Sequence, residues 1–96
     1  MMTRGDAMRF VEDMKNKVEV NVVAGINVFL TPPSPLYDKE GEGFRIIIDP
    51  SALSEVDEDK VTHYATLKGF TAEEVWTDLG RYIKVWKRKG MNMQRA

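Results

Sequence analysis

The chain has 96 residues, 43% of them hydrophobic, which is enough for one small domain over 1–96 with a single core. The absence of cysteine excludes disulfides, thiolate metal sites and a thiol nucleophile, and it favours a reducing, cytoplasmic location. The formal net charge is only −1, and no apolar run reaches the roughly 20 residues that cross a membrane, so the sequence predicts a soluble protein.

The first predicted element is a helix from about Asp6 to Lys17. Asp6 is a suitable N-cap, and the apolar residues after it recur at helical spacing: Ala7, Phe10, Val11, Met14 and Val18. We expect the chain ends, residues 1–5 and 91–96, to be frayed.

Two or three antiparallel strands are predicted next. Valines alternate with polar residues from Val18 to Val22, and a second alternating run covers 26–31. Ala24-Gly25 separates the two runs, either as a tight hairpin turn or as a glycine bulge in one long strand. The apolar run from Phe44 to Ile48 predicts a central strand that is either buried on both faces or covered by helices.

One short turn and a helix are predicted after this strand. Asp49-Pro50 is typical of a cap followed by a first-turn proline, which predicts a turn that ends at Leu53. Ser54 is a suitable cap for the helix, and Gly69 stands where a helix ends. The β-branched and aromatic residues of 61–70 leave a strand as the alternative.

A last helix is predicted from Phe70 to Lys89. Thr71 and Glu74 form a capping box, acids occupy the first turn, and bases occupy the last. Its apolar residues recur at steps of three and four, which predicts a stripe buried in the core: Val75, Trp76, Leu79, Tyr82, Ile83 and Trp86. The predicted fold is therefore α+β: an N-terminal helix, a two- to three-stranded antiparallel sheet, and two C-terminal helices packed on that sheet.

The charges are distributed unevenly along the chain. Eight acids and two bases lie from Asp38 to Asp59, whereas six bases and no acid lie from Arg81 to the end. The loop 32–43 combines prolines, acids and glycines and is longer than most connections in a small domain. It is either functional or a solvated connection. If it is functional, its prolines limit the entropy lost on binding and its acids attract a basic partner. The expected partner-binding residues are Asp38, Glu40 and Glu42.

Nucleic-acid binding is the alternative function, through the basic end of the last helix. The residues for this role are Arg81, Lys84 and Arg88, which would contact phosphates without reading sequence. Sequence-specific reading by a helix-turn-helix is disfavoured, because the first residues of the last helix are acidic and phosphates would repel them.

No catalytic or metal site is predicted. The sequence has no nucleophile elbow and no phosphate-binding glycine loop, and His63, the only histidine, is expected on a helix surface. The segment from Asp38 to Asp49 has the spacing of a calcium loop, but glutamates replace the short side chains at its third and fifth positions and a strand is predicted after it, so a solvated acidic loop is the preferred interpretation. The sequence thus predicts a small, non-enzymatic, intracellular protein-interaction module without a cofactor, such as a regulator or an inhibitor.

Overall fold

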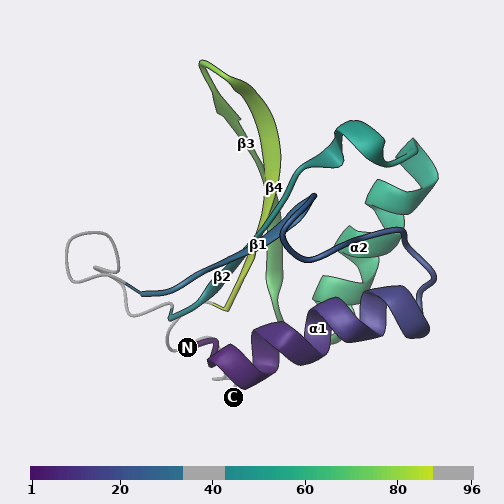
Figure 1. Cartoon of the computed structure of the whole chain (residues 1–96). Coiled ribbons are helices and arrows are strands. Elements are labelled where there is room, and N and C mark those ends of the chain that lie inside the picture. Colours follow the sequence, from purple (N-terminus) through teal and green to yellow (C-terminus); the bar gives the residue numbers. More distant parts are fainter. Residues whose placement is uncertain (34–42, 88–96) are drawn as a thin grey trace.

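The computed structural model describes residues 1–33 and 43–87 (Figure 1). Its elements are α1 (Arg4–Asn16), β1 (Val28–Thr31), β2 (Arg45–Ile48), the short 3-10 helix η1 (Pro50–Ala52), α2 (Glu55–Leu67), β3 (Thr71–Thr77) and β4 (Gly80–Trp86). The strands form one antiparallel sheet in the order β1-β2-β4-β3. The protein is α+β, but the predicted fold, with an N-terminal helix, two or three strands and two C-terminal helices, is wrong.

Thr3, not Asp6, caps α1. The N–H of Asp6 donates to the Thr3 hydroxyl at 3.1 Å, and the Asp6 carboxylate accepts from the N–H of Thr3 at 3.3 Å. The two residues therefore form a capping box, in which Asp6 is the third residue of the helix. The helix buries one face, which consists of Ala7, Phe10, Val11 and Met14.

The predicted strand from Val18 to Val22 is not formed. The chain bends at Glu19, whose φ is 60°, and the N–H of Val20 donates to the carbonyl of Met14 at 2.8 Å. Val20 and Val22 are nevertheless only 2% and 0% exposed. The alternating valines are therefore buried, but their backbone does not pair with another strand.

The residues before β1 form a turn around the buried side chain of Asn27. This amide accepts from the N–H of Val23 at 2.6 Å and donates to the carbonyl of Asn21 at 3.1 Å. Gly25 has a φ of 85°, which glycine adopts without steric cost. Ala24-Gly25 thus lies in a turn that leads into β1, and it neither joins two strands nor forms a bulge.

Helix α2 begins and ends where the sequence predicts. Ser54 caps its first turn, and Gly69 follows its last turn with a φ of 81°. The N–H of Phe70 returns to the carbonyl of Ala65 at 2.8 Å, as in a Schellman motif. The preceding turn, η1, is capped by Asp49, also as predicted.

The predicted last helix is instead the β3–β4 hairpin. Thr71 pairs with Trp86 at one end of the hairpin, and Thr77 pairs with Gly80 at the other. Asp78 and Leu79 form the turn, and Gly80 has a φ of 127°.

Three physical reasons favour the hairpin over the helix. The segment is rich in β-branched and aromatic residues, which fit a pleated surface better than a helix. The acids and bases that would suit the two ends of a helix also face each other across the strands, as Glu73 and Lys84 do. The hairpin further provides β4 as a second neighbour for β2, which a helix could not do.

Both helices cover the same face of the sheet (Figure 1). The buried sheet residues on this face form one cluster with the buried residues of α1 and α2: Val28, Ile46, Ile48, Ile83 and Val85. Strand β2 is internal, as predicted, although Ile47 on its other face is only half-buried. The β3–β4 hairpin extends beyond the helices, and Leu79 at its tip is fully exposed.

Candidate functional site

Of the six predicted binding residues, the structure describes only Arg81 and Lys84. Asp38, Glu40, Glu42 and Arg88 lie outside the described residues. Arg81 and Lys84 lie on β4, and residues three positions apart on a strand point to opposite faces of the sheet. The predicted basic helix face therefore does not exist.

Both of these bases have carboxylate partners. Arg81 donates to both oxygens of Glu58 on α2, at 3.0 and 2.7 Å, and to Glu74 on β3 at 2.9 Å. The hydrogen bonds with Glu58 are the main reason that the pKa of Arg81 is raised. Lys84 lies 3.8 Å from Glu73 and 4.7 Å from the ring centre of Trp86.

The other residues considered for chemistry have structural surroundings. His63 is exposed on α2. Asp49, the last position of the calcium-loop spacing, accepts from the N–H of Ser51 at 3.0 Å, which lowers its pKa. Within residues 1–33 and 43–87, no group of three acidic or histidine side chains is placed to hold a metal ion.

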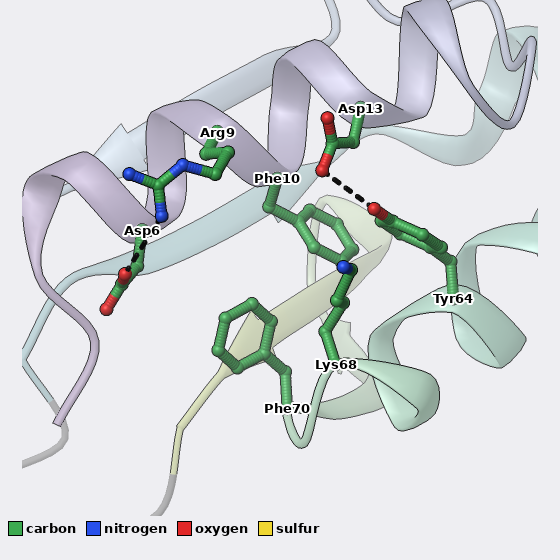
Figure 2. Close-up of a pocket in the computed structure, with 7 residues that line it drawn as sticks. All are labelled: Asp6, Arg9, Phe10, Asp13, Tyr64, Lys68 and Phe70. Atoms are coloured by element: carbon green, nitrogen blue, oxygen red, sulfur yellow. Dashed lines mark hydrogen bonds and ion pairs between the residues drawn. The ribbon is translucent and has the colours of Figure 1, made fainter.

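A small pocket lies between α1 and the end of α2 (Figure 2). Phe10 packs between the rings of Tyr64 and Phe70, with ring centres 5.5 and 5.6 Å apart. The Tyr64 hydroxyl donates to the Asp13 carboxylate at 2.7 Å, which joins the two helices. The volume is about 130 Å³, well below the roughly 300 Å³ at which drug-sized ligand pockets begin. We interpret this cluster as a clasp between the helices.

A larger groove of about 510 Å³ runs between α1 and β1, and it is lined mostly by apolar residues. Its charged members are Arg4, Glu12 and Lys15, all exposed. No hydrogen bond or ion pair within the described part of the chain holds any of these three in one orientation. The groove therefore lacks the fixed polar groups that give a ligand site its specificity.

The β3–β4 hairpin carries an exposed aromatic side chain that is held in place. Trp76 is 69% exposed, and its indole N–H donates to the Glu74 carboxylate at 2.9 Å. Glu74 also accepts from Arg81, which is bound to Glu58. A continuous chain of charge-assisted hydrogen bonds thus connects Trp76 to helix α2 and reduces the freedom of the indole before any partner binds.

The two edges of the sheet differ. At the β1 edge, the outward-facing backbone groups of Val28 are already hydrogen-bonded. Its carbonyl accepts from the N–H of Gly25 at 2.9 Å, and its N–H donates to the carbonyl of Val23 at 3.3 Å. Pro32 and Pro33 follow directly after the strand. Because outward-facing backbone groups alternate along an edge strand, only those of Leu30 face outward without a partner among the described residues of β1. A folded-back turn and prolines are two means by which proteins prevent pairing at an edge, so this edge offers little length for pairing.

The hydrogen-bond pattern across the sheet shows which groups lie on the β3 edge. The backbone N–H of Asp49 donates to the carbonyl of Asn27 at 2.8 Å, so these two residues form a hydrogen-bonded pair. Because hydrogen-bonded and non-hydrogen-bonded pairs alternate along antiparallel strands, Phe29 and Ile47 form the next hydrogen-bonded pair. Ile48 lies between Asp49 and Ile47, so its backbone N–H and C=O point away from β1 and bond to β4.

The same alternation continues through the hairpin. Ile48 pairs with Ile83, so the neighbours of Ile83 on β4 direct their backbone groups toward β3. These neighbours, Tyr82 and Lys84, form hydrogen-bonded pairs with Val75 and Glu73. The residues of β3 that alternate with Val75 and Glu73 therefore direct their N–H and C=O groups to the outer edge of the sheet: Ala72, Glu74 and Trp76. Within residues 1–33 and 43–87, none of these three backbone positions has a partner, and no proline or lysine interrupts β3. The β3 edge is open.

Sequence reasoning missed this surface because it placed Trp76 in a buried helical stripe. Two signals in the sequence could have identified the hairpin. Asp78-Leu79-Gly80 is a short segment with turn-forming residues between two runs rich in β-branched and aromatic residues, and these runs have the length of strands. The ion pair of Arg81 with Glu58 depends on the tertiary fold and has no local signal.

Comparison with known proteins gives no relative from which a role can be transferred: no family model matches this chain, and no curated protein or solved structure shows significant similarity to it. Among residues 1–33 and 43–87, no helix is long and apolar enough to span a membrane.

Proposed function

We propose that this chain is a small, non-enzymatic protein-binding module that pairs an extended segment of a partner protein with the open edge of β3. The observation that carries the proposal is the contrast between the two edges: the chain's own turn covers β1 at Val28 and prolines end that strand, whereas β3 presents the backbone groups of Ala72, Glu74 and Trp76, which are unpaired among the described residues. In this mode of recognition, main-chain hydrogen bonds contribute affinity and side chains beside the edge contribute specificity.

Trp76 is the anchor of the proposed site. Tryptophan is enriched among residues that dominate binding energy, and an indole held by Glu74 loses less freedom on binding than a mobile one. The acids near the edge do not require a basic partner, because Glu73 and Glu74 already have Lys84 and Arg81 as counter-ions. A regulatory or inhibitory role would follow if the bound segment is one that the partner needs for its own activity.

The test is a selection from a displayed library of random linear peptides against the folded protein. Glu74→Pro removes the outward N–H of residue 74 together with the carboxylate, whereas Glu74→Ala removes only the carboxylate. Selected peptides should bind Glu74→Pro at least about tenfold more weakly than Glu74→Ala, a difference of about 1.4 kcal/mol.

The anchor is tested with a matched control at a distant position. Trp76→Ala should weaken the same peptides at least about tenfold. Ile26→Ala removes a side chain of similar exposure, 73% compared with 69% for Trp76, and should leave binding unchanged. The selection is made at protein concentrations at which the chain is monomeric. A selection that then enriches no peptide, or peptides that bind the Trp76→Ala and Glu74→Pro variants as tightly as the natural chain, would overturn the proposal.

A further inference from the structure

We infer that the strand which occupies the β3 edge is β3 of a second copy of this chain, in one specific antiparallel register centred on Val75. The inference rests on the proposed function, since it names the partner of the same edge. Both copies would then contribute the same residues about a twofold axis, as in an isologous dimer.

Edge closure favours a second copy over an unrelated strand. The outer strands of each sheet are β1 and β3, and among the described residues β3 has the longer open edge, three outward-facing positions compared with Leu30 alone on β1. Pairing β3 with β3 of another copy joins two four-stranded sheets into one continuous sheet whose two outer strands are both β1. The outer strands of such a dimer expose only Leu30 before the prolines that follow β1, which is too short for strand pairing, so the assembly stops at two chains instead of continuing into a fibre.

The ladder and the charges restrict the register. Hydrogen bonds form only if residues whose backbone groups point outward on one strand lie opposite such residues on the other strand. These residues occur at every second position of β3, so the twofold axis must pass through a residue and not between two residues. An axis at Glu73 or Glu74 places two glutamates directly opposite each other, which is destabilising. An axis at Trp76 places Glu74 opposite Asp78, with the same disadvantage.

An axis at Val75 avoids all of these repulsions. Val75 then lies opposite Val75 of the second copy, in a non-hydrogen-bonded pair where side chains are closest. Glu74 lies opposite Trp76 of the second copy, and the reverse, so the two pairs exchange about four main-chain hydrogen bonds. The indole N–H of Trp76 already donates to Glu74 within its own chain, at 2.9 Å, so indole and carboxylate are compatible neighbours in this part of the strand.

The centre of this register lies in an exposed part of β3. Glu74 and Trp76 are exposed, whereas Ala72, nearer the start of the strand, is half-buried against the core. An incoming strand can therefore approach β3 at this centre.

A cysteine scan tests the register directly, because the natural chain contains no cysteine. Single substitutions Glu73→Cys, Glu74→Cys and Val75→Cys are exposed to a mild oxidant, and disulfide-linked dimer is measured on a non-reducing gel. Opposed Cα atoms in a non-hydrogen-bonded pair are about 4.5 Å apart, within the range that a disulfide spans. Val75→Cys should therefore form linked dimer, and the other two variants should form little. Stronger linkage at Glu73→Cys or Glu74→Cys would overturn the register.

Sedimentation measures the dimer without any cross-link. The natural chain should sediment with about twice its single-chain mass of 11.0 kDa at high protein concentration. Ile26→Ala, a change away from β3, should remain dimeric. Glu74→Pro, which lacks the outward amide, should dimerise at least about tenfold more weakly than Glu74→Ala, while the circular dichroism of these two variants matches. A natural chain that is monomeric at every concentration would overturn the inference. If that monomer still selects peptides through Trp76, only the second copy is wrong; if it selects none, the proposed function fails as well.

Discussion

Arg81 on β4 donates two hydrogen bonds to Glu58 on α2, at 2.7 and 3.0 Å, and so connects the projecting hairpin to the helices. Each nitrogen contacts its own carboxylate oxygen, which is the paired geometry that guanidinium and carboxylate groups prefer. Because Arg81 also binds Glu74, the position of α2 is transmitted to the group that holds Trp76.

The first prediction concerns this transmission. Arg81→Met should leave the fold intact but loosen Glu74, so the indole N–H of Trp76 should exchange with solvent several-fold faster. Hydrogen exchange measured by NMR reports this, and Trp86 is an internal control, because its indole donates to Glu73 at 3.0 Å and does not contact Arg81. Equal acceleration of both indoles would indicate general loosening of the hairpin instead.

The second prediction separates two apolar residues that the helix interpretation treated alike. Ile83 is 5% exposed, and Ile83→Ala should lower the free energy of unfolding by about 2–5 kcal/mol. Leu79 is fully exposed in the turn, and Leu79→Ala should change the free energy of unfolding by less than about 0.5 kcal/mol. Urea unfolding of both variants measures the difference, and similar losses for the two would mean that the hairpin is wrongly placed.

Local signals predicted α2 correctly because its cap and its end depend on nearby residues. Ser54 bonds within the first turn, and Gly69 has the left-handed conformation that helix ends favour. The same kinds of signal failed for 70–89. Thr71 and Glu74 satisfy the pattern of a helix start, yet they lie on β3, because pairing with β4 places β4 beside β2 and completes the sheet.

The candidate site could not be predicted because it depends on strand pairing. Which edge of a sheet is open follows from strand order and ladder phase, and neither is encoded by local spacing. The basic residues illustrate the same limit. On a helix, Arg81 and Lys84 would share one face, but on β4 they point to opposite faces and each has a carboxylate partner.

The third prediction compares two glycines with the same backbone conformation. Gly43 and Gly69 have φ values of 80° and 81°, so alanine is equally strained at both positions, by about 1–2 kcal/mol. At Gly43 an added Cβ would also lie 2.4 Å from the backbone carbonyl oxygen of Met2, whereas at Gly69 nothing lies within 4 Å. Met2 is fully buried and accepts from Phe44 at 2.8 Å, so its backbone cannot easily move away.

Gly43→Ala should therefore lower the free energy of unfolding by at least about 1 kcal/mol more than Gly69→Ala. Urea unfolding of the two variants measures this difference. Equal losses would show that the pairing between Met2 and Gly43 contributes little to stability.

The last prediction is a pH dependence that arises from the clasp between α1 and α2. Burial, and then the hydrogen bond and charge of Asp13, raise the pKa of Tyr64 from 10.0 to about 12. A pKa that is higher in the folded state means that folding favours the neutral phenol, so the stabilisation is fully present below pH 10 and is lost as the pH rises toward 12.

Tyr64→Phe removes the titrating group and the hydrogen bond while it keeps the ring against Phe10. The natural chain should therefore be more stable than Tyr64→Phe by a constant margin from neutral pH to about pH 9, and the margin should shrink above pH 10. Urea unfolding of both proteins across this range measures the margin, and the other tyrosines cancel because both proteins contain them. A margin that stays constant up to pH 12, or one that grows with pH, would show that Tyr64 is not held as the neutral donor to Asp13.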